Sequence, residues 1–282
     1  MKFHKIYVEI TDICKLSCSF CTPKKAVRGI MPLPLYEKII SQITQHTRFI
    51  SLHVLGDPLC VNNLSAYIDI GAYYNVRFDI VSSAAFLKEE HFSLLTQPHI
   101  HQVSFSLDAL FDNKHLQKDI NTYFDTILTF YNYAKIKSPN LYINLRLFGN
   151  YDYTYFLQKF PYAILQPQKR RFRLEKNFFL RFHQAFKWHT QQKTPKVENT
   201  TTWQTYPNTP YCLGTIRQLA ILANGIVIPC CIDAHAQMPL GDFNVQNFLE
   251  ILYSKKMKDM QESLRTHKNL PQLCQNCSFR GV

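Results

Sequence analysis

The chain has 282 residues, 46% of them hydrophobic, and Lys and Arg outnumber Asp and Glu by 32 to 20. This length and apolar content predict a sizeable core and exclude a disordered or fibrous chain. No run of about 18 apolar residues occurs, and the first residues, MKFHKIYVEI, lack a secretory pattern, so we expect a cytoplasmic protein without a membrane partner. The formal net charge of +12 favours an anionic partner such as RNA.

Short apolar runs alternate with longer amphipathic stretches in the first half of the chain, a pattern typical of repeated strand–helix units. The predicted strands are residues 6–10, 50–55, 76–82, 102–107 and 141–148. The predicted helices are residues 33–47, 63–75, 86–97 and 119–137. Together they predict an α/β protein whose parallel strands form an open or closed barrel.

The pattern changes after Asn150, where residues 150–200 are rich in aromatic and basic side chains and show no clean period. The polar, Thr-rich and Pro-broken segment 190–210 is predicted to be a linker. We therefore expect a core domain at residues 1–200 and a small domain at residues 205–282.

The small domain is predicted to contain a hairpin that turns at Asn224-Gly225, because this dipeptide tolerates a positive φ at both turn positions. A single helix over residues 243–268 is expected to lead to the final pair of cysteines. The nine cysteines favour metal binding or catalysis over disulfides in a chain of this kind.

Three cysteines follow the first predicted strand in C-x3-C-x2-C spacing: Cys14, Cys18 and Cys21. A structural zinc ion normally takes four ligands, whereas three close cysteines can hold three irons of a cubane and leave the fourth iron open. A zinc site or unrelated structural cysteines are the alternatives.

This motif, with the aromatic Phe20 just before its third cysteine, resembles the cluster-binding loop of the radical S-adenosylmethionine (SAM) superfamily. The resemblance implies a partial (β/α)6 TIM-like barrel and a [4Fe-4S] cluster whose open iron binds SAM. It also implies that an electron from the cluster cleaves SAM to a 5′-deoxyadenosyl radical, which abstracts a substrate hydrogen. A donor such as flavodoxin or ferredoxin would supply the electron.

Other loops resemble the SAM-contacting segments of the same family. The sequence Leu55-Gly56-Asp57-Pro58 stands in place of the family's Gly-Gly-Glu-Pro, so its first Gly and its Glu are both altered and Asp57 has a shorter reach. Ser-Ser-Ala ends the third strand and Ser-Leu-Asp the fourth. The resemblance implies these cofactor-binding residues: Phe20, Gly56, Asp57, Ser83, Ser106, Asp108 and Arg146.

A second set of cysteines lies near the end of the chain, where twelve residues separate Cys212 from Gly225 and four separate Gly225 from Cys230. A helix and the pair Cys274 and Cys277 follow. Four thiolates can close one centre without an added ligand. The arrangement resembles the SPASM or twitch domain of radical SAM enzymes, which implies one auxiliary [4Fe-4S] cluster; a four-cysteine zinc site is the alternative.

Cys60, Cys231 and Asp233 lie outside these two sets of cysteine ligands. Cys231 and Cys60 are not assigned to a cluster, although Cys231 could replace Cys230 as a ligand. Asp233 is a candidate catalytic acid or base, while an Asp after a strand commonly forms a turn.

The basic and aromatic stretch suggests the substrate. Its basic residues could hold phosphates while its aromatics stack on bases, or it could be a solvated face over a core. The basic residues are Lys169, Arg170, Arg171, Arg173, Lys176, Arg181 and Lys187, and the aromatics are Phe172, Phe178, Phe179, Phe182 and Trp188. We expect a peptide, protein or RNA substrate, with dehydrogenation of a small alcohol as one alternative and a non-enzymatic zinc or iron-sulfur nucleic-acid-binding protein as the other.

Overall fold

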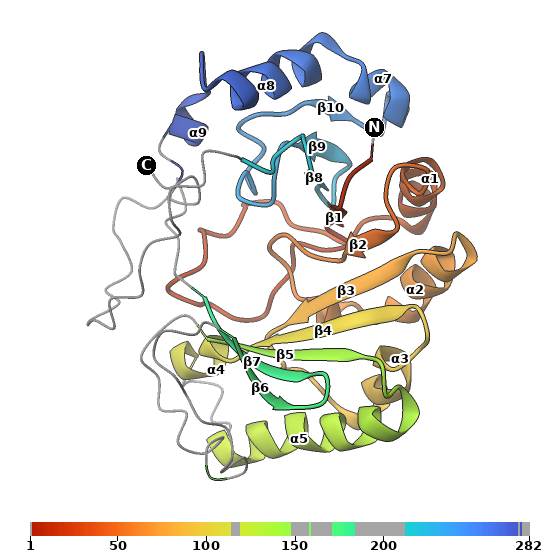
Figure 1. Ribbon diagram of the computed structural model, residues 1–282, viewed down its shortest axis with the longest axis vertical. Helices are drawn as coiled ribbons and strands as arrows, with labels where there is room; N and C mark the ends of the chain where they lie inside the picture. The colour runs from red at the N-terminus through yellow and green to blue at the C-terminus, as the bar shows by residue number, and fades with distance from the viewer. Residues whose placement is uncertain are drawn as a thin grey trace.

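The computed structural model describes residues 2–113, 119–147, 158, 171–183, 212–275 and 277. Its strands are β1 (Lys5–Val8), β2 (Phe49–Ser51), β3 (Arg77–Ser82), β4 (Ile100–Ser106), β5 (Tyr142–Leu147), β6 (Arg171–Glu175), β7 (Phe178–Phe182), β8 (Gln218–Ile221), β9 (Ile226–Ile228) and β10 (Gly241–Asp242). They form one sheet in the order β10-β9-β8-β1-β2-β3-β4-β5-β7-β6 (Figure 1).

The central part of this sheet is parallel, from β8 through β1, β2, β3, β4 and β5 to β7. Antiparallel pairing occurs at both ends, between β6 and β7 and among β8, β9 and β10. The five strands predicted from the first half of the chain are all present, so the α/β class is confirmed.

Helices connect the parallel strands. They are α1 (Leu33–Ile43), α2 (Leu64–Tyr73), α3 (Phe92–Leu95), α4 (Asp108–Asp112) and α5 (Ile120–Lys137), with 3-10 turns η1 (Pro58–Cys60) and η2 (Glu89–His91). Helices α1, α2, α3 and α5 lie along the outer side of the curved sheet (Figure 1). No helix in the described part of the chain has the length and apolar character needed to cross a membrane.

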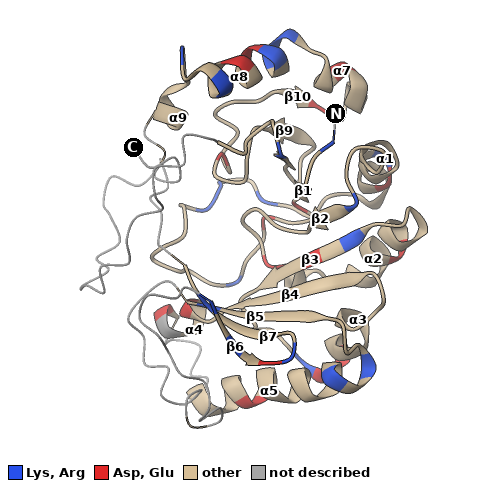
Figure 2. Cartoon of the chain, in the orientation of Figure 1, with Lys and Arg blue, Asp and Glu red and all other residues tan. Residues whose placement is uncertain are grey.

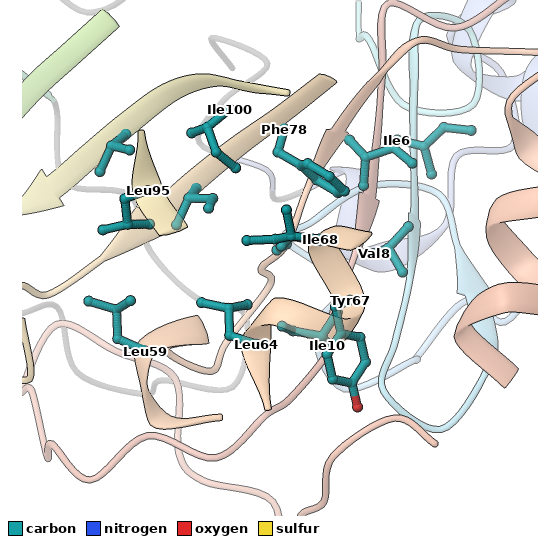
Figure 3. Close-up of a cluster of buried hydrophobic side chains, with 14 of the residues drawn as sticks. Ile6, Val8, Ile10, Leu59, Leu64, Tyr67, Ile68, Phe78, Leu95 and Ile100 are labelled. Atoms are coloured by element: carbon teal, nitrogen blue, oxygen red, sulfur yellow. The ribbon is translucent and has the colours of Figure 1, made fainter. Parts of the chain in front are cut away.

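The main core lies between the sheet and these helices. Successive side chains of a strand point to opposite faces, so Ile6 and Val8 of β1 face the helices and are fully buried. Phe78 of β3 packs in the same cluster as Tyr67 and Ile68 of α2 (Figure 3). Each such side chain contributes about 1.5–3 kcal/mol of burial, which fixes the sheet against the helices.

The C-terminal segment extends the same sheet. β8 pairs with β1 in parallel, and Lys5 of β1 is opposite Gln218. The predicted hairpin turn at Asn224-Gly225 is confirmed between β8 and β9, and Gly225 has a φ of 88°. The linker predicted at 190–210 lies outside the described residues.

The prediction of one helix over residues 243–268 is wrong. The segment forms α7 (Phe248–Leu252) and α8 (Lys255–Thr266), and α9 (Gln272–Gln275) follows. The side chain of Ser254 accepts a hydrogen bond from the backbone N–H of Met257 at 3.1 Å. This N-cap starts a new helix where the sequence periodicity continues unbroken.

The basic and aromatic stretch contains a hairpin that the sequence patterns did not predict. β6 and β7 turn at Asn177, whose φ is 59°. Phe178 of β7 is fully buried and stacks on Tyr131 of α5, with ring centroids 4.3 Å apart. The aromatics of this hairpin therefore build core.

Gly71 allows α2 to approach the sheet closely, because a Cβ at this position would lie 2.1 Å from the ring of Phe78. We expect Gly71→Ala to lower the free energy of unfolding by about 1–3 kcal/mol through overpacking, as measured by urea titration. Gly29→Ala is the matched control, because a Cβ there meets nothing within 4 Å. Equal stability of the two variants would contradict this packing.

Candidate functional site

The loop after β1 carries Cys14, Cys18 and Cys21, and all three are half-buried. Burial raises the pKa of Cys18 to about 12 and that of Cys21 to about 11; the Cys14 sulfur raises both further, and the Cys21 sulfur raises that of Cys18. Each thiol is therefore neutral near pH 7, and binding iron must displace its proton. The loop brings three soft ligands together, as the sequence predicts.

Asn113, at the end of α4, contacts this loop although no sequence pattern indicates it. Its Oδ1 accepts a hydrogen bond from the backbone N–H of Ser17 at 2.8 Å, and its Nδ2 lies 3.1 Å from the sulfur of Cys18. The residue is completely buried. A side chain from the fourth strand–helix connection therefore holds the cysteine loop in place.

Glu9 at the end of β1 is a second residue that the sequence analysis missed. Its fully buried carboxylate accepts hydrogen bonds from the backbone N–H groups of Leu55, at 2.9 Å, and Ala223, at 3.1 Å. Lys25 of the cysteine loop lies 3.5 Å from Glu9 and 3.3 Å from Asp12. The only signal of Glu9 in the sequence is that an acidic residue stands at a strand position where an apolar residue is expected.

The loop after β2 packs directly on the base of the cysteine loop. A Cβ on Gly56 would lie 2.0 Å from the carbonyl oxygen of Thr11, so only glycine fits there. The buried carboxylate of Asp57 accepts hydrogen bonds from Ser82 Oγ at 3.1 Å, Ser83 Oγ at 2.7 Å and the Ser83 N–H at 2.9 Å. Two of the predicted SAM-binding residues, Asp57 and Ser83, therefore bind each other.

The remaining predicted SAM-binding residues lie at the same end of the sheet. Ser106 and Arg146 are opposite each other on β4 and β5. Burial lowers the pKa of Arg146, while the nearby Tyr7, Cys231 and Asp108 raise it. Asp108 is completely buried, and Phe20 is half-buried in the cysteine loop.

Two of the C-terminal cysteines flank the β8–β9 hairpin: Cys212 precedes β8 and Cys230 follows β9. Burial raises the pKa of Cys230, and the nearby sulfurs of Cys231, Cys212 and Cys277 raise it further. Cys274 is buried and its thiol lies 3.9 Å from the sulfur of Met238. Cys230 is thus a neighbour of two of its three predicted co-ligands.

Cys231 faces a different neighbourhood, although it is adjacent in sequence. Its side chain is hydrogen-bonded to that of Tyr7 and lies near Arg146 and Lys5. These contacts place it on the inner side of the sheet and favour Cys230 as the C-terminal ligand.

Asp233, the candidate catalytic acid or base, is almost fully buried. Its two carboxylate oxygens accept hydrogen bonds from the backbone N–H groups of Gln237, at 2.7 Å, and Met238, at 2.9 Å. Burial raises its pKa, and these two N–H groups oppose the shift. Asp233 thus shapes the turn after β9, and a catalytic role for it stays a prediction.

The chemistry of the donor sets fits iron-sulfur clusters, since each set consists of cysteines alone. Among the described residues, no three Cys, His, Asp or Glu side chains are already gathered tightly enough to hold a metal ion. Cys18 lies near Cys14 and Cys21, and Cys230 lies near Cys212 and Cys277.

Burial raises the pKa of Glu9 above its ordinary value of 4.5. The stability that its proton contributes is therefore full below pH 4.5 and is lost as the pH rises through the folded-state pKa. From pH 4.5 up to the folded-state pKa, the wild type should lose stability relative to Glu9→Gln, by up to about 1.4 kcal/mol per pH unit. Urea titrations of both proteins across this range test it, and parallel pH profiles would contradict it.

Residues 212–278 match the SPASM family, an iron-sulfur cluster-binding domain. No curated protein matches the chain. Several solved structures share its fold at low identity. BtrN in complex with AdoMet and 2-DOIA is 19% identical, with 98% of this chain and 94% of that chain covered and a TM-score of 0.64. Native anSMEcpe with bound AdoMet is 13% identical, with 97% of this chain and 86% of that chain covered and a TM-score of 0.62.

SuiB of Streptococcus suis is 13% identical, with 99% of this chain and 71% of that chain covered and a TM-score of 0.56. All three are radical SAM enzymes with SPASM or twitch domains on TIM-like barrels. The expected fold is thereby confirmed. The chain has the TIM-like barrel fold of the radical SAM enzymes, with a SPASM domain at residues 212–278.

Proposed function

We propose that the chain is a radical SAM enzyme. The observation that carries the proposal is the loop of Cys14, Cys18 and Cys21 at the end of β1 in a barrel of this fold. These cysteines would hold a [4Fe-4S] cluster, which supplies the electron that cleaves SAM to a 5′-deoxyadenosyl radical. Structures of BtrN and anSMEcpe with AdoMet support SAM as the cofactor.

The chain's own residues would bind and orient SAM. Gly56 lets its loop pack against Thr11 at the base of the cysteine loop, and Asp57 fixes the orientation of Ser83. Arg146 offers a buried cation for the SAM carboxylate, with Ser106 opposite it and Asp108 nearby. Phe20 would cover the cofactor from the cysteine loop.

A second cluster would be held by Cys212, Cys230, Cys274 and Cys277 in the SPASM domain. Four cysteine ligands leave no iron free for substrate, so this cluster would transfer electrons or stabilise the domain. We expect a cytoplasmic donor such as flavodoxin or ferredoxin to reduce both clusters.

Anaerobically reconstituted protein should form 5′-deoxyadenosine from SAM and dithionite. We expect Cys14→Ala, Cys18→Ala and Cys21→Ala each to lower this rate at least about 100-fold, because losing a ligand removes the cluster or its open iron. Chromatographic analysis of 5′-deoxyadenosine measures the rate. Cys60→Ala is the matched control and should retain it. Zinc without sulfide in the wild type would instead support a metal-stabilised binding protein.

The substrate is best argued from the inner face of the sheet. An aromatic floor is formed by Phe49, His101, Tyr142 and Phe179, with successive ring centroids 5.2, 5.3 and 6.3 Å apart. Asn144, two residues after Tyr142 on β5, points to the same face and is only 1% exposed.

Several polar atoms on this face are buried without a hydrogen-bond partner among the described residues: Ser51 Oγ, His53 Nδ1, Asp79 Oδ1 and both amide atoms of Asn144. Leaving such a group unpaired costs about 1–3 kcal/mol. Burial, together with Arg146 and Lys5, lowers the pKa of His53 to about 3, so it is neutral. An uncharged group that both donates and accepts hydrogen bonds, such as an alcohol, would satisfy this set.

The described part of the basic and aromatic stretch gives less support to RNA. Phe172 and Phe178 are buried in the main core and therefore cannot stack on bases. Lys and Arg lie on separate elements, including α8 and the β6–β7 hairpin, and α8 also carries Asp and Glu (Figure 2). Lys169, Arg170, Lys187 and Trp188 lie outside the described residues. We therefore favour a hydroxylated small molecule, with a peptide as the second candidate, since SuiB was solved with the precursor peptide SuiA and anSMEcpe with the Cp18Cys peptide.

If Asn144 serves a substrate rather than the fold, replacing its unpaired amide with an apolar group should stabilise the protein. We expect Asn144→Leu to raise the thermal unfolding midpoint by about 2–4 °C. Thr96→Val is the control, because the Thr96 hydroxyl already donates to the carbonyl of Phe92 at 2.8 Å, and this variant should be less stable. A lower midpoint for Asn144→Leu would show that its amide is needed by the fold.

A further inference from the structure

The side-chain amide of Asn113 is fully engaged inside the protein. Its Oδ1 accepts from the Ser17 N–H at 2.8 Å, while its Nδ2 donates to the carbonyl of Ala109 at 2.7 Å and lies 3.1 Å from the Cys18 sulfur. An amide nitrogen carries two N–H donors. One points at the helix carbonyl and the other points at the sulfur.

These neighbours also fix which end of the amide faces the sulfur. The flipped amide would set its oxygen against the Ala109 carbonyl and its NH2 against the Ser17 N–H. Both contacts would be repulsive, so the network permits a single assignment. An N–H donor of Asn113 therefore faces the Cys18 sulfur, whether that sulfur carries a proton or binds iron.

The contact between Asn113 and Cys18 lies in a largely buried setting. The Asn113 amide is completely buried and the Cys18 side chain is half-buried, so little water competes for the sulfur. Asn113 thus favours negative charge on this sulfur, and it does so without a charge of its own.

We propose that Asn113 is a positioning residue that raises the reduction potential of the cluster bound by Cys14, Cys18 and Cys21. The inference rests on the proposed function, because it requires Cys18 to be a cluster ligand. Reduction adds one electron from the external donor, and part of that charge falls on the cysteine sulfurs. A hydrogen bond to a sulfur favours the more negative, reduced state, and cluster potentials depend on such bonds.

The test is a redox titration of anaerobically reconstituted full-length protein, followed by EPR of the signal that SAM perturbs. Asn113→Leu has a similar size and lacks the donor. We expect the ratio of reduced to oxidised cluster at a fixed potential to fall about tenfold, equal to about 59 mV for one electron. Asn113→Asp keeps an oxygen that accepts from the Ser17 N–H, but it turns an oxygen instead of an N–H donor toward the Cys18 sulfur. The ratio of reduced to oxidised cluster should therefore fall further than in Asn113→Leu.

Ser19→Ala is the matched control. Ser19 Oγ donates to Asp112 Oδ1 at 3.1 Å, so this change removes a contact between the same loop and the same helix and alters no charge. Its ratio should equal that of the wild type. Asn113 variants with full iron and sulfide but an unchanged ratio would overturn the inference and leave the proposed function intact. Wild type without iron and sulfide would overturn both.

Discussion

The arrangement of the site depends on the buried carboxylate of Glu9. It directly follows β1 and accepts hydrogen bonds from backbone N–H groups in the loops after two neighbouring strands, at Leu55 after β2 and at Ala223 after β8. Lys25 of the cysteine loop adds an ion pair. A buried acid is costly unless its oxygens are paired, so each of these contacts supports the others. The N-terminal cysteine loop and the SPASM hairpin therefore share one anchor.

The sequence pattern predicted the repeated strand–helix units of the fold. Alternation of apolar runs and amphipathic stretches located β1 to β5 and most helices, because these elements bury one face each. It failed in the β6–β7 hairpin, because β6 alternates over only five residues and β7 carries aromatics on both faces. It also merged α7 and α8, since their break depends on one capping contact at Ser254. Contacts of that kind are decided by geometry and leave little trace in a periodic pattern.

The residues of the site also divide into those that the sequence indicates and those that only the structure reveals. Cysteines at fixed spacing are visible in the sequence because the ligand chemistry demands both residue type and spacing. Glu9 and Asn113 are not, since each is a single polar residue that binds backbone N–H groups 46 or more positions away in the chain. The Asp57 carboxylate, for which the resemblance implies contact with SAM, accepts a hydrogen bond from Ser83, and the SAM contact stays a prediction. A motif identifies the segment that builds a site, while the fold decides which atom each side chain meets.

Cys230 and Cys231 are adjacent in sequence but face different parts of the protein. Cys230 lies near Cys212 and Cys277, while Cys231 lies near Tyr7 and Arg146 on the inner face. One turn of backbone therefore borders both a cluster site and the space where we place the substrate. The imidazole of His235 adds a contact at 2.9 Å to the hydroxyl of Thr22, directly after Cys21. The same short segment therefore contacts the N-terminal cysteine loop and also carries Cys230 of the C-terminal set.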